Sequence, residues 1–126
     1  MSRPAYLDDK NIRWDTNDAD LEGIMSKKSK WWGEWRERYF ILKGPKIFFT
    51  KSSTEAPHGM ISLVDCLSVE NLAAESGKAH IFEMIMRDGE KFVLSAKTKE
   101  VKDNWVKEVS RQILISTSAF FEDFDD

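Results

Sequence analysis

The sequence predicts a mainly β domain, a bent and partly open barrel of about seven antiparallel strands with one α-helix at its C-terminal end. Two observations lead to this prediction. Short apolar segments separated by turn-forming residues fill residues 21–96, a pattern typical of antiparallel strands joined by hairpins. Beyond them the apolar period changes to that of a helix, which would cover one open end of the bent sheet.

A turn signal separates most of the expected strands. Gly44 and Pro45 lie between two apolar segments, and Asp88-Gly89 is a typical two-residue hairpin turn. The polar stretch SSTEAPHG follows the third apolar segment. The expected strands are residues 21–28, 35–42, 46–51, 59–64, 66–72, 80–87 and 91–96.

An amphipathic helix of about four turns is expected at residues 98–116. Thr98 is a suitable N-cap, because its hydroxyl can accept a hydrogen bond from a backbone N–H in the first turn. Apolar residues recur at every fourth position, so one face of the helix is apolar and the other is charged. These apolar residues are Val101, Trp105, Val109 and Ile113.

Charge divides the chain into three parts. The 126 residues carry a net charge of −3, without the basic excess of a nucleic-acid-binding domain, so no nucleic-acid partner is expected. Residues 1–20 carry −2 and residues 116–126 carry −4, which leaves +3 for residues 21–115. We expect a flexible acidic N-terminal arm over 1–20, anchored by Trp14, a folded domain over 21–115 and an acidic C-terminal tail over 116–126.

The composition favours a cytosolic protein. Cys66 is the one cysteine of the sequence and cannot form an intramolecular disulfide, which fits a reducing compartment. No apolar run approaches the roughly 18 residues of a membrane span, and neither a signal peptide nor a lipidation motif is recognisable. Any membrane contact is therefore expected to come from the folded surface.

No motif of an enzyme or a metal site is present in the sequence. His58, His80 and Cys66 lack the spacing of metal ligands. A Gly-rich phosphate loop, a nucleophile elbow and an HExxH motif are absent. We expect no catalysis, no metal and no cofactor, and we expect His58 to be an exposed loop residue. The alternative is that His58 lies near the barrel mouth and adds positive charge at endosomal pH.

The positive charge is concentrated in KKSKWWGEWRERYF, residues 27–40, which holds five cations and five aromatic residues. Alternation along a strand places Arg36 and Arg38 on the same face as Phe40. If Phe40 lines the core, the arginines lie at the barrel mouth, with Lys27 across from them. Arg presents paired N–H donors to a phosphate and Lys a point charge, so the three cations form a candidate site for a phosphorylated headgroup.

The stretch GIMSKKSKWWGEWRERYFIL, residues 23–42, resembles the opening of a pleckstrin homology (PH) domain. Trp105 is similar to the tryptophan that PH domains bury in their last helix, and the order of strands and helix extends the resemblance over residues 21–115. The chain also looks like the small single-PH-domain proteins of plants. The resemblance implies a phosphoinositide-binding, membrane-targeting module with Lys27, Arg36 and Arg38 as a Lys-x(n)-Arg-x-Arg motif.

The loop between the first two strands is expected to contact the membrane. Trp31 and Trp32 lie in this loop, and indole rings favour the headgroup layer of a bilayer. Lys28 and Lys30 would attract an anionic leaflet, each contributing about 1 kcal/mol. Trp35 is expected at the edge of the core. The residues expected inside the core are Phe40, Phe92, Trp105 and Val109.

Departures from the family pattern bear on the choice of lipid. Many PH domains that select multiply phosphorylated inositides have a Tyr near the end of the third strand, and residues 47–51 (IFFTK) contain none. Glu34 and Glu37 flank the arginines and would oppose a highly charged headgroup. These features, with the plant-type resemblance, favour phosphatidylinositol 3-phosphate on endosomes. Phosphatidic acid is the alternative ligand.

A protein-interaction module with the same fold is the alternative function, binding a peptide or protein along a strand edge, beside the helix or through the tail. The acidic, Phe-containing tail supports this alternative, and it could also compete for the basic site. We expect a monomer that is cytoplasmic and peripheral on membranes, with a role in signalling or membrane trafficking.

Overall fold

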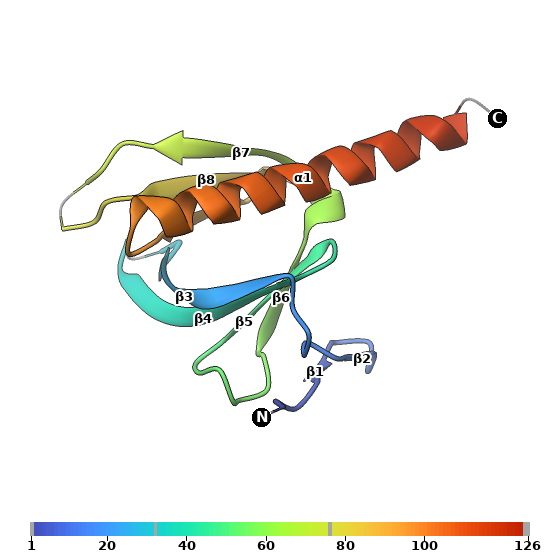
Figure 1. Ribbon diagram of the computed structural model, residues 1–126, viewed down its shortest axis with the longest axis horizontal. Coiled ribbons are helices and arrows are strands. Elements are labelled where there is room, and N and C mark those ends of the chain that lie inside the picture. Colours follow the sequence, from blue (N-terminus) through green and yellow to red (C-terminus); the bar gives the residue numbers. More distant parts are fainter. Residues whose placement is uncertain (1, 32, 76, 125–126) are drawn as a thin grey trace.

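The computed structural model describes residues 2–31, 33–75 and 77–124, with side chains described as far as Ser118. Seven strands form one antiparallel sheet, which a long C-terminal helix follows (Figure 1). The predicted mainly β fold with a C-terminal helix is thereby confirmed. The strands of this sheet are β3 (Leu21–Lys28), β4 (Trp35–Lys43), β5 (Lys46–Thr50), β6 (Gly59–Ser62), β7 (Cys66–Leu72), β8 (Ile81–Met86) and β9 (Lys91–Ser95).

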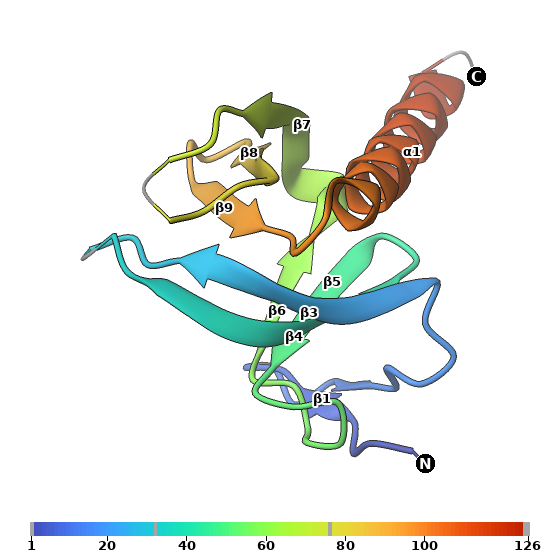
Figure 2. The same cartoon turned by 60° about the vertical axis from the view of Figure 1, so that its left-hand side comes forward.

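The sheet bends into two layers, β3–β6 and β7–β9, which Figure 2 shows facing each other. The strand order is β6-β5-β4-β3-β9-β8-β7. β3 pairs with β4 along its whole length but with β9 only through Ser26 with Ser95 and Lys27 with Leu94. At the other side, the 3-10 turn η1 (Leu63–Asp65) carries the chain from β6 into β7. The barrel is therefore partly open, as predicted.

The helix α1 (Lys99–Phe124) packs against β7 and η1. Thr98 caps it as predicted, since its Oγ1 accepts a hydrogen bond from the backbone N–H of Val101 at 3.1 Å. The helix continues past Ser116, where the prediction ended it, because no Gly or Pro follows to stop it. Residues 117–124 are thus helical rather than an irregular tail. No helix in the described ranges has the length and apolar character needed to cross a bilayer.

The main core lies between the two sheet layers and the helix. Trp105 is 1% exposed, and its ring meets that of Phe40 edge-on at 6.5 Å between centroids. Phe40, Trp105 and Val109 are buried as predicted, and Phe92 is partly buried against the same cluster.

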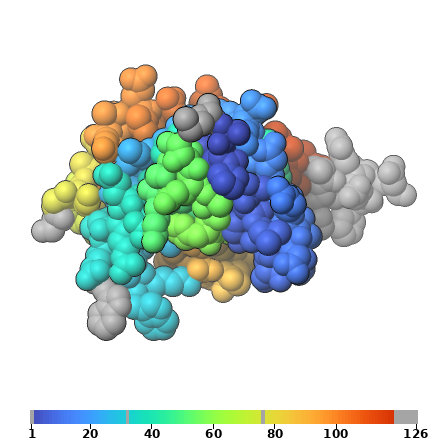
Figure 3. Space-filling view, turned by 90° about the horizontal axis from the view of Figure 1, so that it is seen from below, coloured from blue at the N-terminus to red at the C-terminus, as the bar shows by residue number. Residues whose placement is uncertain are grey.

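The N-terminal arm, expected to be flexible, is instead packed on the outer face of the sheet. β1 (Tyr6–Leu7) and β2 (Arg13–Trp14) form a separate two-stranded sheet. The rings of Tyr6 and Trp14 lie 5.8 and 6.3 Å from that of Phe48 in β5. Figure 3 shows the arm, in dark blue, against the green segment between β5 and β6. The arm therefore covers Phe48, which points away from the main core and is only 1% exposed.

Arg3 is the buried polar anchor of this arm. Its guanidinium donates to the hydroxyl and the carbonyl oxygen of Thr16 at 2.9 Å and forms an ion pair with Glu22 at 3.2 Å. It also donates to the carbonyl oxygen of Ser53 at 3.0 Å. Glu22 accepts a further hydrogen bond from the Tyr39 hydroxyl at 2.6 Å. Burial, followed by this bond, raises the pKa of Tyr39 to about 12.

Replacing Arg3 by alanine should lower the free energy of unfolding by about 2 kcal/mol, because Thr16 and Glu22 lose buried partners. Urea unfolding followed by circular dichroism measures this change. Arg13→Ala is the matched control: it removes the same charge from an exposed site in the same arm and should stay within about 0.5 kcal/mol of the wild type. Equal stability of the two variants would contradict a stabilising role for Arg3.

The Arg3 contribution should also depend on pH. Burial alone would raise the pKa of Glu22, but the hydrogen bonds from Tyr39 and Arg3 and the charge of Arg3 outweigh it, so the pKa lies below the ordinary value of 4.5. The stabilisation linked to this carboxylate is present above the ordinary value and is lost as the pH falls through the lowered pKa. The stability difference between the wild type and Arg3→Ala should therefore shrink in acid.

Candidate anion-binding site

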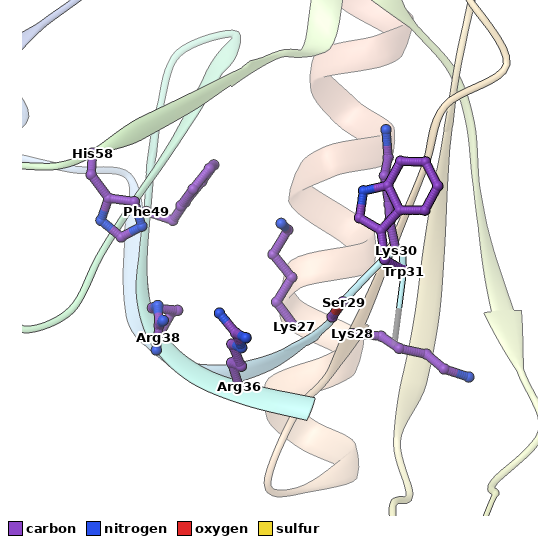
Figure 4. A pocket seen from close by; sticks show the side chains of 9 residues that line it. All are labelled: Lys27, Lys28, Ser29, Lys30, Trp31, Arg36, Arg38, Phe49 and His58. Carbon is purple, nitrogen blue, oxygen red and sulfur yellow. The ribbon is translucent and has the colours of Figure 1, made fainter. Parts of the chain in front are cut away.

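A cavity of about 400 Å³ lies at the end of the barrel beside the β3–β4 loop (Figure 4). Five of its lining residues are lysine or arginine, and none of the nine described lining residues carries a carboxylate. An anion is therefore the ligand that the walls of this cavity favour. The lining residues are Lys27, Lys28, Ser29, Lys30, Trp31, Arg36, Arg38, Phe49 and His58.

Strand register brings together the three cations predicted for the headgroup. Lys27 of β3 lies directly opposite Arg36 of β4, and Arg38 is two positions further along β4. Figure 4 shows all three side chains extending into the same space. Nη1 of Arg38 donates to the carbonyl oxygen of Glu37 at 2.7 Å, which helps to hold this guanidinium in place. The predicted convergence of Lys27, Arg36 and Arg38 on one cavity is what the structure contains.

Lys27 lies against two aromatic rings. Its Nζ is 5.3 Å from the ring centroid of Phe49 and 5.6 Å from that of Phe92. Burial is the main reason that the pKa of Lys27 lies below its ordinary value; Glu90 opposes the shift, and the other cations of the cavity reinforce it. The two ring faces offset part of the cost of burying this charge. An anion in the cavity would offset more of it.

Lys28 and Lys30, predicted to attract the membrane, are each paired with a carboxylate. Lys28 Nζ bonds Glu75 Oε1 at 2.9 Å and lies 5.7 Å from the ring centroid of Trp35. Lys30 Nζ lies 2.6 Å from Glu90 Oε1. In Figure 4 the Lys28 side chain extends away from the three headgroup candidates. Lys28, at the end of β3, and Lys30, in the loop, are therefore both partly neutralised within the protein.

Of the two tryptophans predicted to contact the membrane, the structure describes Trp31. Trp31 is 86% exposed beside the cavity, whereas Trp32 lies outside the described residues. The loop closes tightly, since the N–H of Ser29 donates to the carbonyl oxygen of Glu34 at 2.7 Å and Gly33 adopts a φ of 65°. A positive φ of this size favours glycine. Trp31 is thus held on a short loop next to the basic cavity.

The two acidic residues expected to limit the ligand differ in their effect. Glu34 Oε2 lies 3.7 Å from Arg36 Nη2, so this carboxylate competes with a ligand for one of the cavity cations. Glu37 lies 3.9 Å from Lys97 Nζ and alternates with the arginines along β4. Neither residue lines the cavity. The opposition to a highly charged ligand therefore comes mainly from Glu34.

Phe49 lines the cavity, a place that the sequence did not predict for it. The only prediction for this segment concerned the absence of a tyrosine from residues 47–51. A Cβ atom on Gly59, its direct partner across the β5–β6 pair, would lie 2.0 Å from Cζ of Phe49. Glycine is thus needed for the ring to lie over this position. Gly59 begins β6 and lies opposite the apolar run of β5. This glycine was the sequence feature that could have indicated the position of the Phe49 ring. Ser29, which also lines the cavity, gave no signal beyond its place in the basic stretch.

The comparisons with known proteins agree with this geometry. The family model described as PH domain matches residues 19–114. The chain belongs to the PH domain family. PH domains commonly bind phosphoinositides, and the family is generally non-catalytic. The resemblance drawn from residues 23–42 is thereby confirmed.

Over the aligned residues, curated relatives are between 26% and 32% identical to this PH domain. Pleckstrin homology domain-containing protein 1 of Arabidopsis thaliana is 28% identical over 117 residues, covering 88% of this chain and 79% of that protein. Sesquipedalian-1 of Homo sapiens is 29% identical over 94 residues, covering 74% of this chain. The chain spans only 37% of sesquipedalian-1, which has further sequence outside the matched region.

Solved structures show the same fold. The C-terminal PH domain of pleckstrin in complex with D-myo-Ins(1,2,3,4,5)P5 has a TM-score of 0.65 and 25% identity, covering 75% of this chain and 97% of that one. A solution structure of the human pleckstrin C-terminal PH domain has a TM-score of 0.68 and 21% identity, covering 90% of each chain.

Replacing Gly59 by alanine should displace the Phe49 ring and lower the free energy of unfolding by about 1–3 kcal/mol, because the added methyl group overpacks a filled position. Chemical denaturation and the NMR shifts of the ring protons measure the effect. Gly23→Ala is the control, since a Cβ there meets nothing within 4 Å. The smaller side chain of Phe49→Leu should restore part of the stability of Gly59→Ala, and an unchanged ring in Gly59→Ala would contradict this packing.

Proposed function

We propose that this PH domain targets membranes by binding a phosphoinositide headgroup in the basic cavity, with Lys27, Arg36 and Arg38 as the residues that hold the phosphates. The observation that carries the proposal is the composition of the cavity, five cations with no carboxylate among its described lining residues. The cavity volume of about 400 Å³ is within the range of small-molecule sites. The pleckstrin PH domain, 25% identical, was solved with an inositol pentakisphosphate.

The two arginines and the lysine have complementary roles in this proposal. Arg36 and Arg38 come from one rigid strand and can each present paired N–H donors to a phosphate. Lys27 supplies a point charge from the opposing strand, and its partly buried position strengthens its attraction for an anion. Each charge-assisted bond would contribute about 1.5–3 kcal/mol to binding.

Phosphatidylinositol 3-phosphate is the lipid that we favour as the ligand. Phe49 offers no hydroxyl to an additional phosphate, and Glu34 near Arg36 would repel one. A headgroup with one phosphomonoester between Lys27 and the arginines would meet less repulsion from Glu34 than a headgroup with several phosphates. Phosphatidic acid exposes the same phosphomonoester and is the alternative ligand that a lipid panel would distinguish. An endosomal, cytoplasmic-face location follows from the favoured lipid.

The β3–β4 loop would enter the headgroup layer when the cavity binds its lipid. Trp31 is exposed next to the cavity, and an indole ring is stabilised at the membrane interface. Lys28 and Lys30 would contribute to the attraction, while Trp32, also predicted to contact the membrane, lies outside the described residues. The pairing of Lys28 with Glu75 and of Lys30 with Glu90 reduces the long-range attraction of these lysines to an anionic membrane.

A protein partner beside the helix is the second candidate function. One observation favours it: apolar side chains are exposed around η1 and the adjoining part of α1. The exposed apolar residues are Val64, Leu67, Leu114 and Ile115.

Residues 117–124, by contrast, continue the helix away from the β3–β4 loop (Figure 1). This arrangement gives no support to competition of the tail for the basic cavity.

The double variant Arg36→Ala with Arg38→Ala should weaken binding to phosphatidylcholine vesicles containing phosphatidylinositol 3-phosphate by about 100-fold or more. Co-sedimentation measures the affinity. The control Arg13→Ala with Arg111→Ala removes the same charge from exposed arginines outside the cavity and should leave the affinity nearly unchanged. Unchanged binding by the cavity variant would exclude the headgroup site and favour the protein-partner function.

Trp31→Ala should weaken vesicle binding by about tenfold, because the exposed ring no longer enters the interface. The same variant should bind the soluble headgroup inositol 1,3-bisphosphate with wild-type affinity, as measured by calorimetry. Leu7→Ala is the control, since Leu7 is also a large exposed apolar residue but lies in the N-terminal arm. An equal loss for vesicles and for the soluble headgroup would contradict membrane insertion and indicate a role in the cavity itself.

A further inference from the structure

His58 is held at the rim of the basic cavity by the strand next to it. Its backbone N–H donates to the carbonyl oxygen of Phe49 at 3.0 Å, and its ring meets the Phe49 ring edge-on with 5.1 Å between centroids. Figure 4 shows the imidazole on the Arg38 side of the cavity, across from the β3–β4 loop. His58 is exposed and lies one residue before β6, as expected for a loop residue, but these two contacts with Phe49 hold its ring at the rim of the cavity.

The charges around His58 are mostly positive. Arg38 faces it from β4, Lys51 from the end of β5 and Lys27 from β3, while Glu55 in the β5–β6 connection is the opposing charge. Burial, followed by the three cations, holds the pKa of His58 below its ordinary value. Both effects disfavour the protonated imidazole.

We propose that His58 is a fourth phosphate ligand that takes up a proton when a phosphomonoester enters the cavity, so that headgroup binding becomes tighter as the pH falls. This inference rests on the proposed headgroup site and adds its regulation by pH. A phosphomonoester carries between one and two negative charges near neutral pH. Placed beside Arg38, it would reverse the sign of the local field at the imidazole, and a protonated ring could donate a hydrogen bond to it.

The direction of the pH effect follows from linkage. Because the bound state favours the protonated imidazole, the gain in affinity is full below the pKa of free His58 and is lost as the pH rises above the pKa in the complex. The phosphate itself loses charge near pH 6 as the solution is acidified, which weakens binding. Only a comparison with a variant that lacks the imidazole separates these opposing effects.

The test compares the wild type with His58→Gln by calorimetry on soluble inositol 1,3-bisphosphate, and by co-sedimentation with phosphatidylcholine vesicles containing phosphatidylinositol 3-phosphate. At about pH 7.5 the two proteins should bind alike, and at about pH 5.5 the wild type should bind about tenfold more tightly than His58→Gln. Calorimetry in buffers of different ionisation enthalpy should show proton uptake by the wild type, and less by the variant.

His80→Asn provides the matched control. His80 is the other histidine of the two in the sequence, and its φ of 55° is a conformation that asparagine tolerates. This variant should keep the wild-type pH profile.

The possible results separate the two proposals. A constant affinity ratio between the wild type and His58→Gln across this pH range would overturn the role of His58 and leave the headgroup site standing. A pH effect seen on vesicles but not on the soluble headgroup would also overturn it, because the proton would then act on membrane approach. Absence of binding by the wild type at every pH would overturn both proposals.

Discussion

Repulsion among like charges is the constraint on which the arrangement of this site depends. Five lysines and arginines line one cavity without a carboxylate among the described lining residues, and each raises the free energy of the others' charged forms. The protein offsets this repulsion from outside the cavity. Glu75, Glu90 and Glu34 pair with Lys28, Lys30 and Arg36, and the faces of Phe49 and Phe92 lie against Lys27. The cavity itself stays positive.

Holding such charges together requires rigid neighbours, and the fold supplies them on both faces of the sheet. The main core packs against Phe40 and Leu42, while the N-terminal arm covers Phe48 on the opposite face. β4, which carries both cavity arginines, therefore packs on the main core and pairs with β5, whose outer face the arm covers. Because Arg3 ties the arm to Glu22 of β3, the strand opposite the arginines is fixed by the same layer.

The site could be predicted from the sequence as far as strand alternation reaches. The alternation that places Phe40 in the core also places Arg36 and Arg38 together, and register across one hairpin adds Lys27. The pairing of Lys28 with Glu75 joins residues 47 positions apart, which a single sequence does not specify. The packing of the arm did leave a signal, since the unbroken apolar runs of β4 and β5 predict burial on both faces. The helix beyond Ser116 was missed because charge was given more weight than the absence of a helix breaker.

The cavity cations differ in how much each can contribute to phosphate binding, because they differ in their contacts within the protein. Lys28 and Lys30 already bond carboxylates at 2.9 and 2.6 Å, so an incoming phosphate must compete with those bonds. Exchanging one exposed ion pair for another gives little net binding energy, because each such pair contributes little. The charge of Lys27 is offset only partly by aromatic faces, and burial lowers its pKa because it disfavours the charged form. A phosphate beside Lys27 would relieve that cost as well as form a bond. Selection of the ligand should therefore be concentrated on Lys27 and the β4 arginines, while Lys28 and Lys30 mainly shape the approach.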